Sequence, residues 1–233
     1  MFVDGDEAPM KLFEVRGLSK CFGKITALTD VSFDVGRGEL LGLIGPNGAG
    51  KSTLFECLAG VMAFDSGTPV PKDLVFYVPD GIAPWPEQSV EWALDFAIGF
   101  FGGRAELRQE VIEQMNLRAL LKQPIGTLSK GQRKRALIAV GLLTPQPALL
   151  IDEPLDGLDL RQMREVAAAL RVHAERGRTL FLSIHQISDA ARFCDRFVLL
   201  SGGRVCGEGT IAELAAVAGV ASGDLEEVFL ALT

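Results

Sequence analysis

The sequence predicts an α/β fold with a mainly parallel sheet, an antiparallel N-terminal β subdomain and an inserted α-helical subdomain. Three observations support this prediction. Continuous apolar runs that are typical of buried strands alternate with helical segments through most of the chain. Near the N-terminus, apolar and polar residues instead alternate, as in Val31, Phe33 and Val35. Residues 89–121 show a helical pattern with few β-branched residues, which indicates an insertion into the α/β body.

The first third of the chain is predicted to supply mostly strands. Residues 1–9 are expected to form a loose tail, and Pro79-Asp80-Gly81 is typical of a turn. One helix is predicted over residues 52–58, ending near Gly60. The apolar patterns predict strands over residues 12–15, 25–28, 31–35, 40–44 and 73–78.

The second half is predicted to alternate helices and strands. Ser129 is the expected N-cap of a helix that continues to Leu143, where two prolines follow. Capping boxes that begin at Thr210 and Asp224 predict two short helices near the end. The remaining patterns predict helices over 160–176 and 188–193, and strands over 148–151, 179–184, 196–200 and 204–206.

The composition is that of an ordinary globular protein and argues against several functions. Of the 233 residues, 48% are hydrophobic and 23% charged, and the net charge of −7 argues against nucleic-acid binding. No run approaches the roughly 18 apolar residues that a membrane span needs, and the acidic start is unlike a secretory signal. The four cysteines are scattered without zinc-ligand spacing, so we expect reduced thiols in a cytoplasmic protein.

Residues 45–53 fit the phosphate-binding loop pattern G-x-x-x-x-G-K-[ST] between a predicted strand and a predicted helix. Glycines let backbone N–H groups curl around an anion, and the helix N-terminus adds partial positive charge. A glycine-rich turn is the alternative, but the spacing, Lys51 and Ser52 all match a nucleoside triphosphate site. Lys51 is expected at the β- and γ-phosphates and the Ser52 hydroxyl at Mg²⁺. The loop consists of Gly45, Pro46, Asn47, Gly48, Ala49, Gly50, Lys51, Ser52 and Thr53.

Two carboxylates, Asp152 and Glu153, directly follow the apolar run 148–151. Ligands of parallel α/β sheets bind beyond the carboxyl ends of the strands, so both carboxylates are expected at the site. Asp152 is expected to hold Mg²⁺, mostly through water, and Glu153 to act as general base on the attacking water. The alternative is a pair of acidic residues that only opens a loop before Pro154.

Four further stretches carry motifs that belong together. They are residues 19–23, 128–132 (LSKGQ), 156–159 (DGLD) and 183–185 (SIH). With the phosphate loop, and in this order, they resemble the adenine-stacking loop, the LSGGQ signature, the D-loop and the switch histidine of the ABC-type ATPases. The resemblance extends over about residues 11–210, and the combination is highly specific.

The resemblance implies a P-loop NTPase core that binds ATP and Mg²⁺ between two copies of the chain arranged head to tail. It also implies that residues 1–84 and 145–233 form the nucleotide-binding core and residues 85–144 the inserted helical subdomain. Phe22 would stack on adenine, although an isolated aromatic residue could equally be part of the core. His173 matches no motif and is expected at the surface.

The site residues follow by matching positions. Ser129 and Gly131 would meet the γ-phosphate bound to the opposite copy, Asp159 would bridge the copies, and His185 would align the γ-phosphate and water. The implied catalytic residues are Glu153, His185 and Lys51. Beyond the phosphate loop, the implied nucleotide-binding residues are Phe22, Ser129, Gly131, Gln132 and Asp159. The implied metal site comprises Ser52, Asp152 and Asp80.

Two positions depart from the family pattern. Asp80 stands where the family has a Gln that senses Mg²⁺ and links the site to the transmembrane partner. Its carboxylate could approach Mg²⁺, or Asp80 could be only the middle of a Pro-Asp-Gly turn. Lys130 replaces a signature glycine, and with residues 133–135 it forms a basic cluster, either a solvated helix face or a source of positive field near the phosphate.

The helix predicted over residues 90–101 is apolar around most of its circumference, with Glu91 and Asp95 on one stripe. One-sided packing does not need so much apolar surface. In ABC transporters this region flanks the groove that receives a short helix of the membrane subunit. Residues from Asp80 to Phe101 are therefore a predicted docking face for a separate transmembrane permease, with packing inside the helical subdomain as the alternative.

These features predict the ATP-hydrolysing subunit of an ABC transporter, in which ATP-driven dimerisation powers substrate movement by a separate permease. We expect it on the inner face of the plasma membrane, held peripherally by that permease, and it resembles stand-alone exporter-type subunits. A soluble non-transport member, such as an iron–sulfur assembly ATPase, is the main alternative. A GTPase or kinase that shares only the phosphate loop is disfavoured by residues 128–132 and His185.

Overall fold

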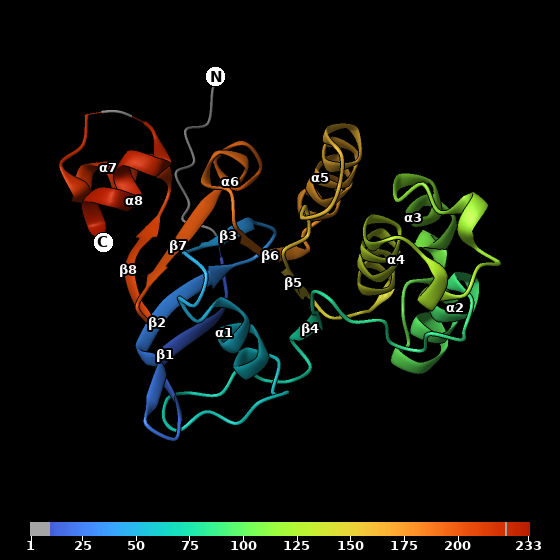
Figure 1. The fold of residues 1–233 in the computed structure, drawn as a ribbon, viewed down its shortest axis with the longest axis horizontal. Helices are drawn as coiled ribbons and strands as arrows, with labels where there is room; N and C mark the ends of the chain where they lie inside the picture. The colour runs from blue at the N-terminus through green and yellow to red at the C-terminus, as the bar shows by residue number, and fades with distance from the viewer. Residues whose placement is uncertain (1–9, 222) are drawn as a thin grey trace.

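Within the described part of the chain, six strands form the central sheet, which lies in the middle of the molecule (Figure 1). The computed structural model describes residues 10–221 and 223–233, so the predicted tail over residues 1–9 lies outside the described residues. The strands are β3 (Leu40–Ile44), β4 (Val75–Val78), β5 (Ala148–Asp152), β6 (Thr179–Ile184), β7 (Arg196–Ser201) and β8 (Arg204–Gly209). Their order is β4-β5-β6-β3-β7-β8, and only β8 is antiparallel to its neighbour. The predicted mainly parallel sheet is confirmed.

The N-terminal segments form a separate antiparallel sheet of two long strands, β1 (Lys11–Phe22) and β2 (Ile25–Gly36). The prediction of three short strands is wrong in number, because the interruptions in the apolar pattern are β-bulges within continuous strands. Asp30, for example, has a left-handed φ of 51° inside β2. A tight turn joins the two strands between Phe22 and Ile25, where Gly23 has a φ of 61°.

Helices cover both faces of the central sheet. In Figure 1, α1 (Lys51–Leu58) lies on one side, and α5 (Leu160–Glu175) and α6 (Ile187–Phe193) lie on the other. Because successive side chains of β5 point to opposite faces of the sheet, they belong to two different apolar cores. Leu149 and Ile151 belong to the apolar core that includes α5, whereas Leu150 belongs to the core that includes α1.

The segment after β4 is helical and lies beside the sheet, opposite the C-terminal helices (Figure 1). It contains α2 (Val90–Phe101), α3 (Arg108–Gln114) and α4 (Lys130–Leu143), with short 3₁₀ turns between them. The predicted start of α4 is confirmed, because Ser129 caps it in a capping box with Gln132. The chain ends with α7 (Ile211–Ala218), which has a capping box at Thr210, and α8 (Leu225–Leu232), which Asp224 caps.

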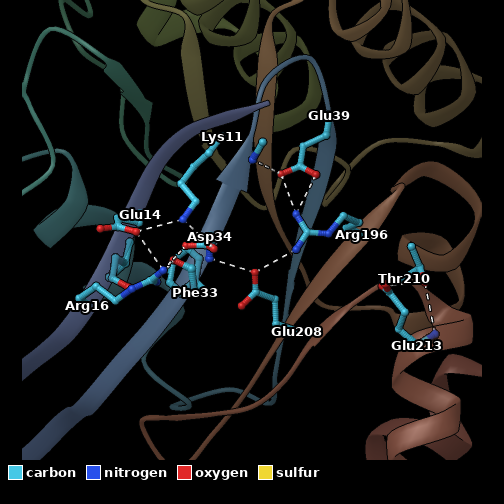
Figure 2. A network of polar contacts seen from close by, with 12 residues as sticks. Lys11, Glu14, Arg16, Phe33, Asp34, Glu39, Arg196, Glu208, Thr210 and Glu213 are labelled. Carbon is cyan, nitrogen blue, oxygen red and sulfur yellow. Dashed lines mark hydrogen bonds and ion pairs between the residues drawn. The ribbon is translucent and has the colours of Figure 1, made fainter. Parts of the chain in front are cut away.

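A network of polar contacts joins the β1–β2 sheet to β7 and β8 (Figure 2). Glu208 Oε1 accepts hydrogen bonds from the backbone N–H of Asp34 and from Arg196 Nη2, both at 2.9 Å. Arg196 Nη1 donates to Glu39 Oε2 at 3.1 Å, and Glu39 Oε1 accepts from the Gly36 N–H at 2.6 Å. The network fixes the orientation of the N-terminal hairpin on the sheet.

The expectation that His173 lies at the surface is wrong, and one of the two alternatives for the basic cluster on α4 is excluded. His173 is 1% exposed rather than at the surface, because α3 packs against α5 there and Gln114 Oε1 lies 3.1 Å from His173 Nε2. The basic cluster on α4 is not one solvated face, because Lys134 and Arg135 are buried. Arg135 donates instead to the carbonyl oxygen of Met115 at 2.8 Å, inside the helical segment.

Candidate functional site

The loop of residues 45–50 joins β3 to α1 and borders an open cavity of about 270 Å³, which Glu153 also lines. Gly48 and Gly50 have left-handed φ values of 81° and 106°. A Cβ on Gly50 would lie 2.8 Å from the Ala27 carbonyl oxygen, whereas one on Gly48 would meet no atom within 4 Å. The cavity wall at Gly48 is therefore kept open by the missing side chain, which fits a loop that wraps a phosphate.

Lys51 folds back over this loop. Its Nζ donates to the carbonyl oxygens of Gly45 at 2.7 Å and Pro46 at 3.1 Å. Burial lowers the pKa of Lys51, and the nearby Glu153 and Asp152 carboxylates oppose that shift. A triphosphate fits a buried ammonium that lies beside a glycine loop and a helix N-terminus. It would supply the full negative charge that the buried ammonium needs, whereas the carbonyl oxygens supply only part of it.

Asp152 ends β5 as a buried carboxylate held by two hydroxyl groups. Its partner in the sheet register is Ser183, whose Oγ donates to Asp152 Oδ1. The Tyr77 hydroxyl on β4 donates to Asp152 Oδ2 at 3.4 Å, and burial followed by the Asp152 charge raises the pKa of Tyr77. A carboxylate at a strand end and the Ser52 hydroxyl are the hard oxygen ligands that Mg²⁺ prefers.

Glu153 has a left-handed φ of 49°, which is unusual for a residue with a side chain and costs of order 1–3 kcal/mol. Both of its backbone groups are held. Its N–H donates to Ser183 Oγ at 3.0 Å, and its carbonyl oxygen accepts from Lys134 Nζ and from the Asp156 N–H. In this conformation Glu153 Oε1 lies 3.3 Å from His185 Nε2, so two of the three predicted catalytic side chains meet.

The signature residues do not reach the phosphate loop of the same chain. Ser129 Oγ accepts from the Gln132 N–H at 3.3 Å, and Gln132 Oε1 accepts from the Ser129 N–H at 3.0 Å. Ser129 is exposed, and Gly131 packs so closely on the D-loop that an added Cβ would lie 3.0 Å from the Gly157 carbonyl oxygen. None of these residues lines the phosphate-loop cavity.

Phe22 and Asp159 also lie outside that cavity. Phe22 is 45% exposed, which excludes a core role, and it pairs with Ile25, a residue of the cavity wall. Lys20 Nζ lies 5.2 Å from the centre of its ring. Asp159 is exposed at the N-cap of α5, where Oδ1 accepts from the Gln162 N–H at 2.8 Å.

Asp80 belongs to the charged part of the site as well as to its turn. Its Oδ1 lies 2.8 Å from Lys134 Nζ. Carboxylate oxygens of Asp80, Glu153 and Asp156 all lie within 4.8 Å of one another. Asp80 and Asp152 line one small hollow with the start of α4, so the predicted metal-proximal position of Asp80 stays a prediction.

Sequence reasoning missed three residues that organise the site: Tyr77, Ser183 and Lys134. A signal existed for Ser183, because it is a polar residue inside the apolar strand β6, two residues before His185. Tyr77 is similarly the only polar side chain of β4. Lys134 offered no such signal, since it lies among other basic residues and its burial depends on how α4 packs.

The comparisons with known proteins agree with this geometry. The family model described as ABC transporter matches residues 28–156. The SkfA peptide export ATP-binding protein SkfE of Bacillus subtilis is 29% identical over 210 residues, covering 84% of this chain and 88% of that protein. The Nod factor export ATP-binding protein I of Bradyrhizobium diazoefficiens is 34% identical, covering 84% of this chain and 69% of that protein. A solved structure of the ATP-binding subunit of an ABC transporter is 28% identical with a TM-score of 0.86, and the match covers 94% of this chain and 98% of the solved one.

Proposed function

The chain belongs to the ABC transporter family and is the ATP-binding, ATP-hydrolysing subunit of a transporter, and from this premise we propose how its residues do that work. The observation that carries the proposal is that Glu153 lines the same cavity as the phosphate loop while its carboxylate lies 3.3 Å from His185 Nε2. A general base, a cation and a phosphate cradle thus converge on one space.

In this proposal the loop residues Gly45 to Thr53 bind the triphosphate, and Lys51 exchanges its two carbonyl contacts for phosphate oxygens. Ser52 and Asp152 would hold Mg²⁺, which would neutralise phosphate charge. Ser183 and Tyr77 orient the Asp152 carboxylate through their hydroxyl groups. These are the residues of this chain that determine where the phosphates lie.

Glu153 then acts as general base on water. As water oxygen bonds to the γ-phosphorus, the bond from that phosphorus to the β–γ bridging oxygen breaks and ADP leaves, while the Glu153 carboxylate takes the water proton. His185 aligns the water and the γ-phosphate, consistent with its contact to Glu153. The left-handed backbone of Glu153 supports this role, because strained residues gather at active sites.

A second copy of the chain completes the site. Ser129, Gly131 and Gln132 do not line the cavity of their own phosphate loop, and Ser129 and Asp159 are exposed. We propose a head-to-tail dimer in which these residues close on the nucleotide of the opposite copy. Phe22 stacks on adenine at the rim, where ring and base surfaces attract each other.

The proposed docking face for the permease extends from Asp80 to Phe101, and its aromatic surface is formed by Trp85 and α2. Trp85, Trp92, Phe96 and Phe100 form a continuous row of ring contacts, with centroids 5.0 to 5.7 Å apart along it. Trp85 is 36%, Trp92 38% and Phe100 70% exposed, so the row is not the interior of the helical subdomain. Exposed apolar surface of this kind is typical of interaction sites.

We propose residues 85–144 as a helical subdomain inserted into a nucleotide-binding core, of which the structure describes residues 10–84, 145–221 and 223–233. No helix among the described residues is long and apolar enough to span a bilayer. We place the protein in the cytoplasm, on the inner face of the plasma membrane, held by a separate permease. Because two relatives are named for export, an exporter is the favoured transporter type.

The Glu153→Gln variant tests the proposed function. It should bind ATP, accumulate as an ATP-dependent dimer in gel filtration, and lose at least about a hundredfold of the ATPase rate. The matched variant Glu153→Gln with Ser129→Ala should bind ATP but elute as a monomer, because the contact to the opposite nucleotide is gone. A Glu153→Gln variant that binds ATP without ever dimerising would contradict the two-copy site.

A further inference from the structure

We propose that Lys134 is a positioning residue that holds Glu153 in its left-handed conformation, with Asp80 as the counter-charge of that lysine. The inference rests on the proposed function, in which Glu153 is the general base. Lys134 Nζ donates to the Glu153 carbonyl oxygen and lies 2.8 Å from Asp80 Oδ1. It thereby connects α4, the turn after β4 and the loop after β5 at one atom.

The conformation of Glu153 needs outside support. A residue with a side chain leaves the left-handed region unless its surroundings hold it there. Ser183 fixes the Glu153 N–H from β6, and Lys134 fixes the carbonyl oxygen from α4. Without Lys134 one of these two side-chain anchors is lost, and the Glu153 backbone can relax, which would move its carboxylate from His185.

The burial of Lys134 explains why a charged residue stands at position 80. The Lys134 side chain is only 7% exposed, and a buried ammonium requires a compensating negative charge. The Asp80 carboxylate supplies it, whereas the neutral Gln of the family pattern could not. The ion pair thus gives Asp80 a task that does not involve the metal ion.

The neighbouring lysine strengthens this view. Lys130, one helical turn before Lys134, pairs with Asp156 at 2.5 Å. Two lysines on one face of α4 therefore offset two of the three negative charges of the clustered Asp80, Glu153 and Asp156 carboxylates. Lys130 and Asp156 are 51% and 46% exposed, so solvent screens that pair and the buried Lys134 pair matters more.

A double-mutant cycle tests the inference, with Lys134→Met, Asp80→Asn, the double variant and Arg133→Met as control. Arg133 lies on the same helix, and its side chain has no hydrogen bond or ion pair with any described residue, although its backbone N–H donates to the Ser129 carbonyl oxygen. Lys134→Met should lower kcat at least about tenfold while the KM for ATP changes less than about twofold, because the base is displaced but the nucleotide pocket is not. Arg133→Met should stay within about twofold of the unchanged protein in both constants.

The kcat of the double variant should fall by less than the product of the two single losses. Once Lys134 is replaced, Asp80→Asn no longer removes an ion pair with it. Urea unfolding without nucleotide should show the same non-additivity, since removing one partner leaves a buried charge alone. If Lys134→Met does not fold, Lys134→Arg, which keeps the charge but alters its reach, and Asp80→Asn should each lower kcat with the KM for ATP retained.

Three results would overturn the inference. The first is a kcat of Lys134→Met equal to that of Arg133→Met. The second is a kcat loss of the double variant equal to the product of the two single losses. The third is an Asp80→Asn substitution that raises the half-saturating Mg²⁺ concentration fivefold or more, both with Lys134 present and with Lys134 replaced. The last would assign Asp80 to the metal ion. If the protein without any substitution had no ATPase activity, the proposed function would be refuted instead. The two failures are therefore distinguishable.

Discussion

The Tyr77 hydroxyl donates a hydrogen bond to Asp152 Oδ2 at 3.4 Å, across the neighbouring strands β4 and β5. Tyr77 therefore orients one oxygen of the proposed Mg²⁺ ligand, while Ser183 orients the other. Tyr77→Phe keeps the ring, which packs edge-on against Phe55 with centroids 6.2 Å apart, and removes only this hydroxyl.

We expect Tyr77→Phe to raise the Mg²⁺ concentration for half-maximal ATPase activity about two- to fivefold, as for the loss of one long hydrogen bond. Stability should change little, because the ring contact is retained. ATPase assays over a Mg²⁺ series, with thermal unfolding as the control, measure both quantities. An unchanged Mg²⁺ requirement would mean that Ser183 alone is sufficient to orient Asp152.

Arg178 is a buried cation that holds the end of α4. It is 1% exposed and donates to the carbonyl oxygens of Leu142 at 2.6 Å and Gly141 at 2.9 Å, and to Thr144 Oγ1 at 2.9 Å. Burial lowers the pKa of Arg178 to about 9. The helix C-terminus is the negative end of its dipole, which favours a cation there.

Arg178→Met should lower the free energy of unfolding by about 3 kcal/mol or more, because it strands several buried carbonyl groups. Urea unfolding measures this loss. The exposed Arg176, which pairs with Glu110 at the surface, provides the matched control, and Arg176→Met should leave the transition nearly unchanged. Equal effects of the two substitutions would show that the buried contacts of Arg178 do not stabilise the fold.

How far the sequence predicts this molecule depends on whether a feature is local. The start of α4 at Ser129 and the strand over 40–44 were predictable, because a capping box and a short apolar run are local patterns. The two long N-terminal strands were not, because bulges such as the one at Asp30 look like turns in the sequence. His173 shows the same limit, since helical periodicity does not say which element will cover a given face.

The same contrast between local patterns and contacts of distant segments applies to the candidate site. The phosphate loop, Asp152 and Glu153 follow from spacing, and the structure places Glu153 at the cavity of the loop. The role of Lys134 depends on two distant segments meeting α4, so no local pattern contains it. The sequence therefore predicts the groups that would meet the nucleotide better than the groups that hold them in place.

The glycines at positions 48 and 50 should respond differently to alanine. At Gly50 a Cβ would lie 2.8 Å from both Ala27 O and Leu28 Cδ2, with φ at 106°. At Gly48, with φ at 81°, it would meet nothing within 4 Å. Gly50→Ala should therefore cost about 2–4 kcal/mol of stability, and Gly48→Ala only about 1 kcal/mol of backbone strain.

ATP affinity should fall for both variants, for different reasons. Gly50→Ala distorts the loop, whereas Gly48→Ala places a methyl group at the wall of the phosphate cavity and should weaken ATP binding at least about tenfold. Calorimetric titration with ATP and urea unfolding separate the two effects. If Gly48→Ala binds ATP normally, the cavity beside Gly48 is not where the phosphates lie.

His173 should make stability fall on acidification. Burial, followed by the charges of Arg178 and Arg176, lowers the pKa of His173 from its ordinary 6.5 to about 4. The unfolded chain thus binds a proton more readily than the folded chain does. The contribution of His173 is complete above pH 6.5, is lost progressively between pH 6.5 and 4, and is absent below. The pKa difference corresponds to about 3 kcal/mol.

His173→Gln removes this titration while keeping a polar side chain opposite Gln114. Urea unfolding of both proteins at several values between pH 7 and 4 should show a steeper loss for the unchanged protein, by up to about 1.4 kcal/mol per pH unit over that interval. Carboxylates that titrate in the same range are common to both proteins and cancel in the difference. Parallel pH profiles would mean that the folded protein accepts a proton at His173 as easily as the unfolded chain, and that the contact between α3 and α5 opens to water.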